Sequence, residues 1–301
     1  MLRPYAAHDA PDFLRLINLA RGQNAALESL LTQDAAWPAA HVRQRAVVLR
    51  EETVVGMAEL SRFEYLPPGW LRLTLAVDPQ VRGQGLGAEL YGWVQAQAAH
   101  LRPGGLSVSV LDTDPLSRDW ALRRGFGLHA HRFASELDLS AEFPLPELPV
   151  GTTLRDMTGA SEAEWDRLET LYGDLLTQTP DLEGQPRWTP EVLRSNLRDN
   201  PRARPDWTLL ATTDTGEWLG LCQGATISTG IYNEFTAVVA AARGQGLARA
   251  LKLELIRRAQ AAGVRLMRTN NHAANRPMLG VNVRLGFVAQ TGSWELRREL
   301  D

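Results

Sequence analysis

Residues 82–87 read Arg-Gly-Gln-Gly-Leu-Gly, and residues 243–248 read Arg-Gly-Gln-Gly-Leu-Ala. The first five residues of the two stretches are identical and lie 161 positions apart. Gly125-Phe126 recurs as Gly286-Phe287 at the same offset. A repeat at one fixed spacing indicates an internal duplication. We therefore predict that this chain of 301 residues holds two copies of one domain.

The segment between the two copies is rich in proline. Three prolines fall within residues 143–149. Proline stiffens the backbone and cannot donate a hydrogen bond to a sheet, so such a segment favours a linker between folded units. We predict a first domain over residues 1–143, a linker over 144–149 and a second domain over 150–301.

Each copy has the pattern of a mixed α/β fold. Apolar runs at 70–77 and 235–239 predict buried strands, and each run leads into one of the glycine-rich loops. Leucines at helical spacing follow each loop, for example Leu86 and Leu90, and predict an amphipathic helix. We therefore predict the α/β class, with a mixed sheet in each copy.

The composition is that of an ordinary globular protein, with 44% hydrophobic and 22% charged residues. A formal net charge of −3 and the lack of a long basic tract give no clear nucleic-acid signal. No run of roughly 18 apolar residues is present, so we expect no membrane span. Residues 1–10 lack the pattern of a signal peptide, and Cys222 is the single cysteine. We therefore expect a cytoplasmic protein without a disulfide or a metal site.

Small residues characterise the loop in both copies, and each loop opens a predicted helix. Glycine lets the backbone adopt left-handed conformations and approach a ligand closely. The first N–H groups of a helix have no partner within the helix, and with the helix dipole they favour an anion such as a pyrophosphate. The spacing differs from the dinucleotide-binding fingerprint, and the Gly-Lys-Ser/Thr of a Walker loop is absent.

These residues resemble a known family. Arg82–Gly87 and Arg243–Ala248 are similar to the pyrophosphate-binding motif of the GNAT N-acetyltransferase superfamily. Leu122–Phe126 and Val283–Phe287 are similar to its second signature, a helix that ends in Leu-Gly-Phe. The resemblance covers essentially the whole chain, twice. The tandem layout resembles that of mycothiol synthase and its relatives, which is a likeness of architecture and not of substrate.

The resemblance implies acetyl-CoA as the acyl donor and an amine as the acceptor, which we expect to be a small molecule. It places the CoA pyrophosphate on the loop amides, and the pantetheine arm along the ends of the central strands. A strand N–H would also polarise the thioester carbonyl. The implied contact residues are Val77, Arg82, Gly83, Gln84, Gly85, Leu86 and Gly87 in the first copy, and Val238, Arg243, Gly244, Gln245, Gly246, Leu247, Ala248 and Asn275 in the second.

Direct transfer to an amine needs a base, and Glu234 lies on the strand where the family often places a carboxylate. Strand alternation predicts that Tyr232, Glu234 and Thr236 share one face. A carboxylate beside an amine or an ordered water can accept the proton. The first copy has Leu73 at the equivalent position. Glu234 could equally be a solvated or ion-paired strand residue.

Two further positions leave alternatives open. The family's usual acid, a tyrosine four residues before the Gly-Phe glycine, is replaced by Ala121 and Asn282. Asn275 could simply cap the helix that follows it, since asparagine favours such positions. Asp181 and Glu183 are our candidates for attracting a cationic amine, against the alternative of a solvated loop.

These observations predict an acyl-CoA-dependent N-acyltransferase, with acetyl transfer to a primary amine and chemistry in the second copy. The alternative is a non-catalytic module that binds acyl-CoA and reports on it, which the missing tyrosines favour.

Overall fold

The computed structural model describes residues 1–62, 66–180 and 187–300. The chain divides into two compact units, and each unit contains residues from both copies of the repeat. The first unit comprises residues 1–131 and 291–301, and the second comprises residues 132–290. Each unit has a mixed sheet with helices on both faces, so the predicted fold class is confirmed.

The sheet of the first unit has the strand order β1-β2-β3-β4-β5-β12. Its strands are β1 (Leu2–Pro4), β2 (Arg43–Arg50), β3 (Thr53–Arg62), β4 (Trp70–Val77), β5 (Gly105–Leu111) and β12 (Val288–Glu299). Only β4 and β5 pair in parallel among these described strands. Its helices are α1 (Ala10–Arg21), α2 (Leu27–Ala35), α3 (Leu86–Leu101) and α4 (Pro115–Leu122).

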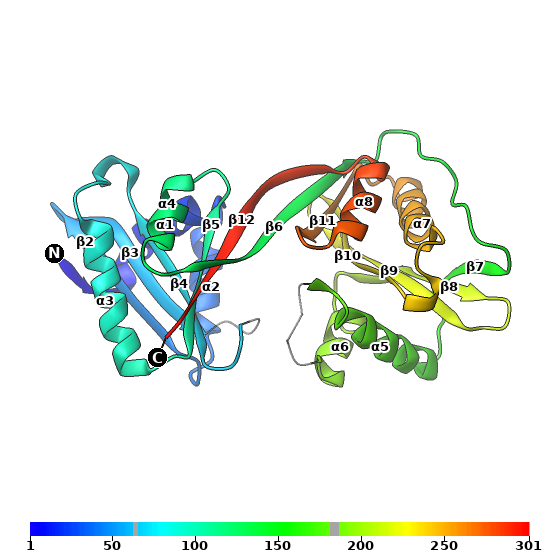
Figure 1. The fold of residues 1–301 in the computed structure, drawn as a ribbon, viewed down its shortest axis with the longest axis horizontal. Coiled ribbons are helices and arrows are strands. Elements are labelled where there is room, and N and C mark those ends of the chain that lie inside the picture. Colours follow the sequence, from blue (N-terminus) through cyan, green and yellow to red (C-terminus); the bar gives the residue numbers. More distant parts are fainter. Residues whose placement is uncertain (63–65, 181–186, 301) are drawn as a thin grey trace. The chain divides into compact units, whose positions relative to one another are not determined.

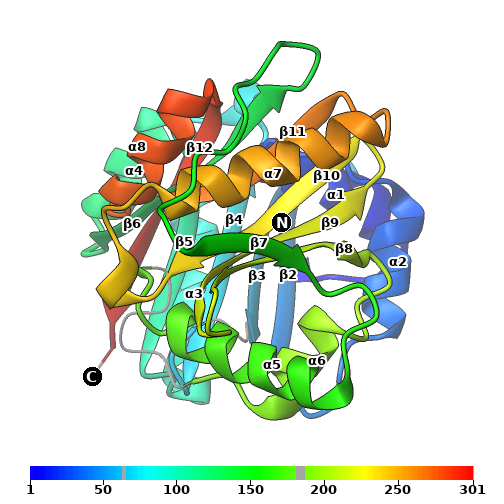
Figure 2. The ribbon, with the colours of Figure 1, turned by 90° about the vertical axis from the view of Figure 1, so that its right-hand side faces the viewer.

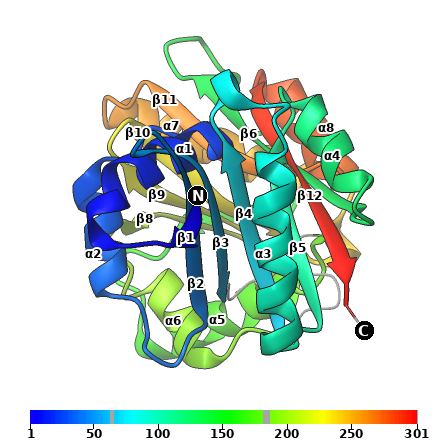
Figure 3. The same ribbon diagram turned by 90° about the vertical axis from the view of Figure 1, so that its left-hand side faces the viewer.

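Two apolar layers flank this sheet. Helices α1 and α2 pack on one face, where Phe13 and Leu16 are fully buried against β2, β3 and β4. Helices α3 and α4 cover the other face, where Leu90 and Val94 lie in a second cluster. Figure 3 shows the blue helices α1 and α2 on the opposite side of the strands from α3.

The second unit repeats this plan, with the strand order β6-β11-β10-β9-β8-β7. Its strands are β6 (Gly127–Asp138), β7 (Thr152–Asp156), β8 (Ala203–Thr213), β9 (Trp218–Ile227), β10 (Gly230–Val238) and β11 (Leu266–His272). Its helices are α5 (Glu162–Leu176), α6 (Pro190–Leu197), α7 (Leu247–Ala261) and α8 (Arg276–Leu285). Helices α5 and α6 pack on one face, and α7 and α8 on the other (Figure 2).

The two copies exchange their last strands. Strand β12 ends the second copy in sequence, yet residues 293–299 pair with β5 of the first unit. Strand β6 ends the first copy, yet residues 132–138 pair with β11 of the second unit. Figure 1 shows the red strand β12 among the strands of the first unit, and the green strand β6 beside β11. The compact units therefore differ from the predicted ranges 1–143 and 150–301, because the sequence shows where a strand lies but not which edge it joins.

The strand exchange predicts where a core mutation will act. Leu296 of β12 is fully buried in the first unit's core, beside Leu90 and Leu106. Leu296→Ala should remove ~2–5 kcal/mol of stability, the usual cost of such a cavity. Hydrogen exchange should report the loss in α3 and β5 and leave α7 and β11 unchanged.

Leu137→Ala provides the matched control. Leu137 belongs to β6 and is buried in the core of the second unit. This variant should loosen α7 and β11 instead. Faster exchange in the second unit after Leu296→Ala would contradict the assignment of β12.

Candidate functional site

The two glycine-rich loops have the same backbone geometry. Gly83 and Gly85 have φ angles of 80° and 84°, and Gly244 and Gly246 have φ angles of 77° and 84°. Such left-handed angles favour glycine, because a Cβ would be strained there. Helix α3 begins at Leu86 and α7 at Leu247, directly after the second positive-φ glycine of each loop.

The space in front of both loops is open. A Cβ built on Gly83, Gly85, Gly244 or Gly246 meets no atom within 4 Å. By contrast, the side chains of Leu86 and Leu247 are buried in the two cores, and a Cβ on Gly87 would contact Trp120 at 3.6 Å. The loops can therefore receive a ligand on their glycine side, through backbone N–H groups at a helix start. The predicted contacts of Leu86 and Leu247 could be made only through their backbone.

The arginine that starts each loop is held in the same way in both units. Arg82 Nε donates to the carbonyl oxygen of Val77 at 3.1 Å, and Arg243 Nε donates to that of Val238 at 3.1 Å. This bond fixes the loop to the end of its central strand. In both units the ladder with the parallel neighbour ends before that point, at Leu73 in β4 and at Tyr232 in β10. The strand ends thus have room beside them for an extended ligand.

The charges around the two loops differ. Arg82 lies 3.5 Å from the Asp114 carboxylate, and Asp78 caps the 3-10 turn Pro79–Val81 that precedes the loop of the first unit. At the same repeat positions the second unit has the neutral residues Asn275 and Val239. Arg243 instead donates to Gln178. The second loop is therefore the more favourable site for an anion.

Asn275 caps helix α8. Its side chain accepts a hydrogen bond from the Met278 N–H at 3.4 Å, as Asp114 does from Ser117 at 3.0 Å. The capping alternative thus describes its local role. A contact between Asn275 and CoA stays a prediction.

Glu234 lies in a β-bulge of β10. Asn233 pairs with Gly224 and Phe235 with Gln223, so Glu234 is the extra residue between two ladder positions. The expected alternation is therefore wrong for Thr236, which hydrogen-bonds Asn233 on the α7 face. A bulge re-aims side chains and is common next to active sites.

The carboxylate of Glu234 lies among aromatic groups on the α5 side of the sheet. Burial raises the pKa of Tyr172 and raises the pKa of Tyr232 to about 12, and the Glu234 charge adds to both shifts. The Tyr172 ring contacts Phe235 with a centroid separation of 4.7 Å. Burial raises the pKa of Glu234, and Arg202, 3.1 Å away, opposes that shift. A carboxylate with a raised pKa is suited to accept a proton near neutral pH.

A comparison with known families finds two matching regions, residues 13–126 and 167–287. Both match the acetyltransferase (GNAT) family, and together they span well over half of the chain. The chain belongs to the GNAT family. The predicted family is confirmed, and GNAT members use acetyl-CoA as acyl donor, so membership supports an N-acetyltransferase.

Solved structures share this fold along essentially the whole chain. A GCN5-related N-acetyltransferase from Sphaerobacter thermophilus is 22% identical, with a TM-score of 0.73 over 99% of this chain and 95% of the other. A tandem GNAT protein from the clavulanic acid biosynthesis pathway is also 22% identical, with a TM-score of 0.67 over 99% and 98%. An acetyltransferase from Colwellia psychrerythraea is 12% identical, with a TM-score of 0.57 over 99% and 100%. A search of the curated proteins found no match.

The position of the usual GNAT tyrosine holds no phenol in either unit. Ala121 is buried in the first core. Asn282 is buried in the second unit, where its Nδ2 donates to Asn271 Oδ1 at 2.8 Å. Its own Oδ1 is buried without a partner among the described residues. Neither an alanine methyl nor an asparagine amide can act as a general acid, so neither residue can take the role of the family's tyrosine.

Sequence reasoning missed a polar face in the first GNAT unit. The strand ladders place Arg72 at the position that Tyr232 holds in the second unit, because the bulge shifts the register by one. Arg21 of α1 donates to Thr74 Oγ1 at 3.1 Å on the same face. Glu59 and Glu295 add carboxylates from β3 and β12. Only the exchanged strand brings Glu295 there, so sequence spacing gave no signal for it.

The chain's single lysine and single cysteine lie together in the second GNAT unit. Lys252 is 1% exposed and donates to Asn233 Oδ1, and Asn233 Nδ2 donates to Cys222 Sγ at 3.4 Å. Asn233 precedes Glu234, so this network braces the bulge from the α7 face. Cys222 itself is fully buried.

Burial lowers the pKa of the Lys252 ammonium to about 8, against about 10.4 in an unfolded chain. The unfolded state therefore binds the proton more tightly, and stability should rise by about 3 kcal/mol between pH 8 and 10.4. Lys252→Met should remove this pH dependence. At pH 7 the substitution should raise the free energy of unfolding by ~2 kcal/mol, which is the gain that remains after the hydrogen bond to Asn233 is lost. Denaturant unfolding of both proteins across this pH range measures the difference. Equal pH profiles would contradict this account.

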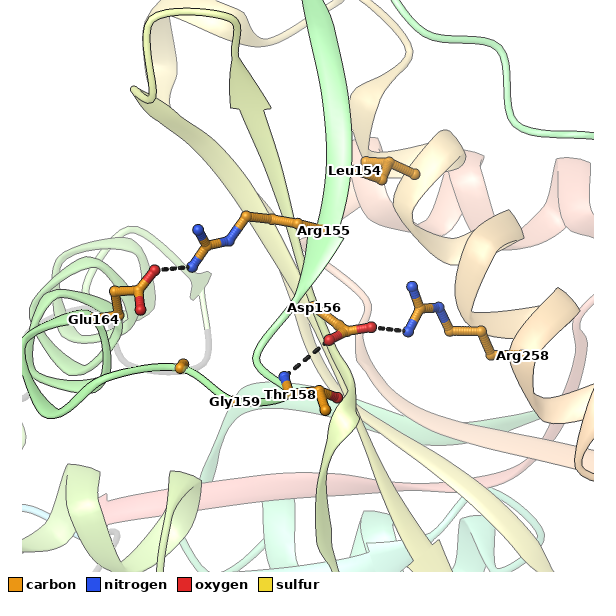
Figure 4. Close-up of a pocket in the computed structure, with 8 residues that line it drawn as sticks. Leu154, Arg155, Asp156, Thr158, Gly159, Glu164 and Arg258 are labelled. Atoms are coloured by element: carbon orange, nitrogen blue, oxygen red, sulfur yellow. Dashed lines mark hydrogen bonds and ion pairs between the residues drawn. The ribbon is translucent and has the colours of Figure 1, made fainter.

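Two cavities of the described chain are lined by neither Glu234 nor the residues of the glycine-rich loops. One of about 450 Å³ in the second unit is lined by Arg155, Asp156 and Glu164 among others (Figure 4). Its charges are paired with one another, since Arg155 bonds Glu164 and Asp156 bonds Arg258. Another of about 550 Å³ in the first unit lies between the end of α1 and residues 78–80, which precede the glycine loop.

The remaining predictions concern membrane spans, metal ligands and the acidic pair Asp181 and Glu183. Among residues 1–62, 66–180 and 187–300, no helix is long and apolar enough to cross a membrane. The same residues contain no group of three potential metal ligands. Asp181 and Glu183 lie outside the described residues.

Proposed function

We propose that this protein transfers the acetyl group of acetyl-CoA to a primary amine of a small molecule, in the second unit. The observation that carries the proposal is Glu234, a carboxylate set in a bulge of β10 where β10 separates from β11. Strand β10, which carries the bulge, also leads into the glycine loop of the second unit. The proposed base and the proposed donor loop are thus connected by one strand.

The donor would be held by the open loop. The N–H groups of residues 244–248 would bind the pyrophosphate, with Arg243 beside it, and the Val238 end of β10 would align the pantetheine arm. The acetyl thioester supplies the activated acyl group. The first loop, residues 82–87 with Val77, would bind CoA in the same manner but less tightly, because Asp114 and Asp78 oppose the phosphate charge.

Glu234 would accept the proton from the amine, directly or through a water. The amine nitrogen then forms a bond to the thioester carbon, and the carbon–sulfur bond breaks to release CoA thiolate. The charge of Glu234 contributes to the raised pKa values of Tyr232 and Tyr172, and the two aromatic rings would line the acceptor site. Aromatic rings beside a carboxylate favour a cationic amine.

Release of free thiol tests the proposal, with the full chain, acetyl-CoA and a panel of primary amines. Steady turnover with at least one amine is expected. The absence of a phenol at Ala121 and Asn282 favours the second candidate, a module that binds acyl-CoA without catalysis. Tight acetyl-CoA binding without turnover across the panel would support that module instead.

A further inference from the structure

Asn233, the residue before Glu234, is tied to three neighbouring elements of the second unit. Its side chain and backbone are 1% exposed. Its carbonyl oxygen accepts from Thr269 Oγ1 of β11 at 3.0 Å. Its Nδ2 donates to the carbonyl oxygen of Gln223 in β9 at 2.9 Å, and its Oδ1 accepts from the Lys252 ammonium of α7. The ladder between β10 and β11 ends one residue earlier, so the Thr269 hydroxyl holds the two strands together where they separate.

The Asn233 amide also spans the β-bulge. A bulge leaves its extra residue outside the ladder, and backbone groups buried there need other partners. Asn233 Nδ2 lies 3.3 Å from the carbonyl oxygen of Phe235, which follows Glu234 in β10. With the bond to Gln223, this contact links the residues before and after Glu234 to each other and to β9. The backbone of Glu234 is therefore held on both sides.

Lys252 determines which way the Asn233 amide points. An ammonium only donates hydrogen bonds, so the atom of Asn233 that faces it must be the oxygen Oδ1. Nδ2 then faces the carbonyl oxygens of β9 and β10, which only accept. The Thr236 hydroxyl, 3.1 Å from Oδ1, adds a second donor on the same side. A reversed amide would set donor against donor and acceptor against acceptor, so one orientation is strongly favoured.

The first unit has apolar or aromatic side chains at the corresponding positions and a regular strand. The ladder and repeat positions of Asn233, Cys222, Thr236 and Lys252 are occupied there by Leu73, Ala58, Leu75 and Tyr91. All four pack in the apolar cluster under α3. The described ladder between β3 and β4 runs from Gly56 and Val77 to Arg62 and Leu71 without a register shift. The polar network and the bulge thus occur together, in the unit that also has Glu234.

We propose that Asn233 and Lys252 are positioning residues for Glu234, which hold the bulge in the conformation that directs the carboxylate to the α5 side of the sheet. This inference rests on the proposed function, because it takes Glu234 as the base. A buried ammonium lowers stability, and proteins retain such groups where activity needs them. The network would then be kept for the geometry of the base and not for the stability of the fold.

Lys252→Met separates activity from stability. At pH 7 this variant should be more stable than the wild type, because a buried charge is removed. We nevertheless expect kcat for thiol release to fall by ~10-fold, with the affinity for acetyl-CoA unchanged, because the base is displaced and the donor loop is not. Asn233→Leu introduces the residue of the first unit and should lower kcat by ~10²-fold. A loss of kcat in a stabilised variant cannot come from unfolding.

Two threonine variants give a matched pair. Thr269→Val removes the hydrogen bond to the Asn233 carbonyl with almost no change of shape, and it should lower kcat at unchanged acetyl-CoA affinity. Thr212→Val removes another buried hydroxyl of the same sheet, which bonds Thr153 between β7 and β8 at 3.1 Å. This control should leave kcat unchanged. An equal loss of kcat in Thr212→Val would contradict the positioning role.

The side-chain carboxylate ¹³C resonance of Glu234 gives a readout that needs no turnover. Glu234→Gln identifies the resonance by its absence. The charged and titratable groups around this carboxylate are Arg202, Tyr172 and Tyr232, and burial raises its pKa. Asn233→Leu and Thr269→Val change no charge. In both variants the titration midpoint should fall towards the ordinary range of glutamate, because a carboxylate that is no longer held in place gains contact with water.

The two kinds of failure are distinguishable. An unchanged kcat in Lys252→Met, or an unchanged Glu234 midpoint in both Asn233→Leu and Thr269→Val, would overturn the positioning role while turnover of the wild type upheld the proposed function. If the wild type released no thiol with any amine, the proposed function would fail. The Glu234 midpoint would then decide by itself whether the network positions the carboxylate.

Discussion

Replacing Glu234 with glutamine is expected to lower kcat by ~10²–10⁴-fold while the affinity for acetyl-CoA is retained. Glutamine keeps the size of the side chain and its place in the bulge but cannot accept the amine proton. Steady-state thiol release measures kcat, and calorimetric titration measures acetyl-CoA binding. A loss confined to kcat identifies a group that acts in the chemical step.

The pH dependence gives a second readout. A base is active when deprotonated, so the rate of the wild-type protein should rise with pH through the pKa of Glu234. Arg202 holds that pKa down against the effect of burial. Arg202→Gln should therefore move the acidic limb of the profile to higher pH, and Glu234→Gln should abolish the limb.

Glu254→Gln is the matched control. Glu254 is also a partly buried glutamate of the second unit, and it pairs with Arg257 and Arg258 on α7, on the other face of the sheet. Its loss can affect stability but should leave the shape of the pH profile unchanged. Full activity of Glu234→Gln would refute the assignment of the base.

Gly246→Val is expected to weaken acetyl-CoA binding in the second unit by ~10²-fold or more. A Cβ at this position enters open space, where the pyrophosphate is proposed to lie. The substitution blocks several hydrogen bonds between loop N–H groups and the charged pyrophosphate, and each such bond contributes ~1.5–3 kcal/mol. A tenfold change in affinity corresponds to ~1.4 kcal/mol, so the loss of two bonds is enough for the expected effect. Titration with acetyl-CoA gives the change.

Gly263→Val controls for backbone strain. Gly263 has a φ of 75° and open space around it, but it follows the far end of α7. Both substitutions therefore carry the same conformational penalty, and only Gly246→Val should affect acetyl-CoA. Gly85→Val makes the same change in the first unit. If it alone abolished turnover, the chemistry would belong to the first unit; if Gly246→Val left affinity unchanged, the proposed loop contact would be wrong.

Local signals in the sequence were sufficient for much of the fold. Glycines are needed where φ is positive, so the Arg-Gly-Gln-Gly pattern located both loops and the helices that start at Leu86 and Leu247. Apolar runs likewise located β4, although β10 begins at Gly230, five residues before the predicted start. These features depend on residues close together in the chain, which is why one sequence reveals them.

Only the tertiary structure decided features that depend on distant partners. The exchange of β6 and β12 was not visible, because either strand could satisfy the hydrogen bonds of either sheet edge. The bulge at Glu234 is a matter of register between β9 and β10, and it makes Tyr232 the counterpart of Arg72. Sequence determined the duplicated loops through local backbone chemistry, whereas strand pairing determined which charges lie together on one face of each sheet, because pairing joins residues far apart in the chain.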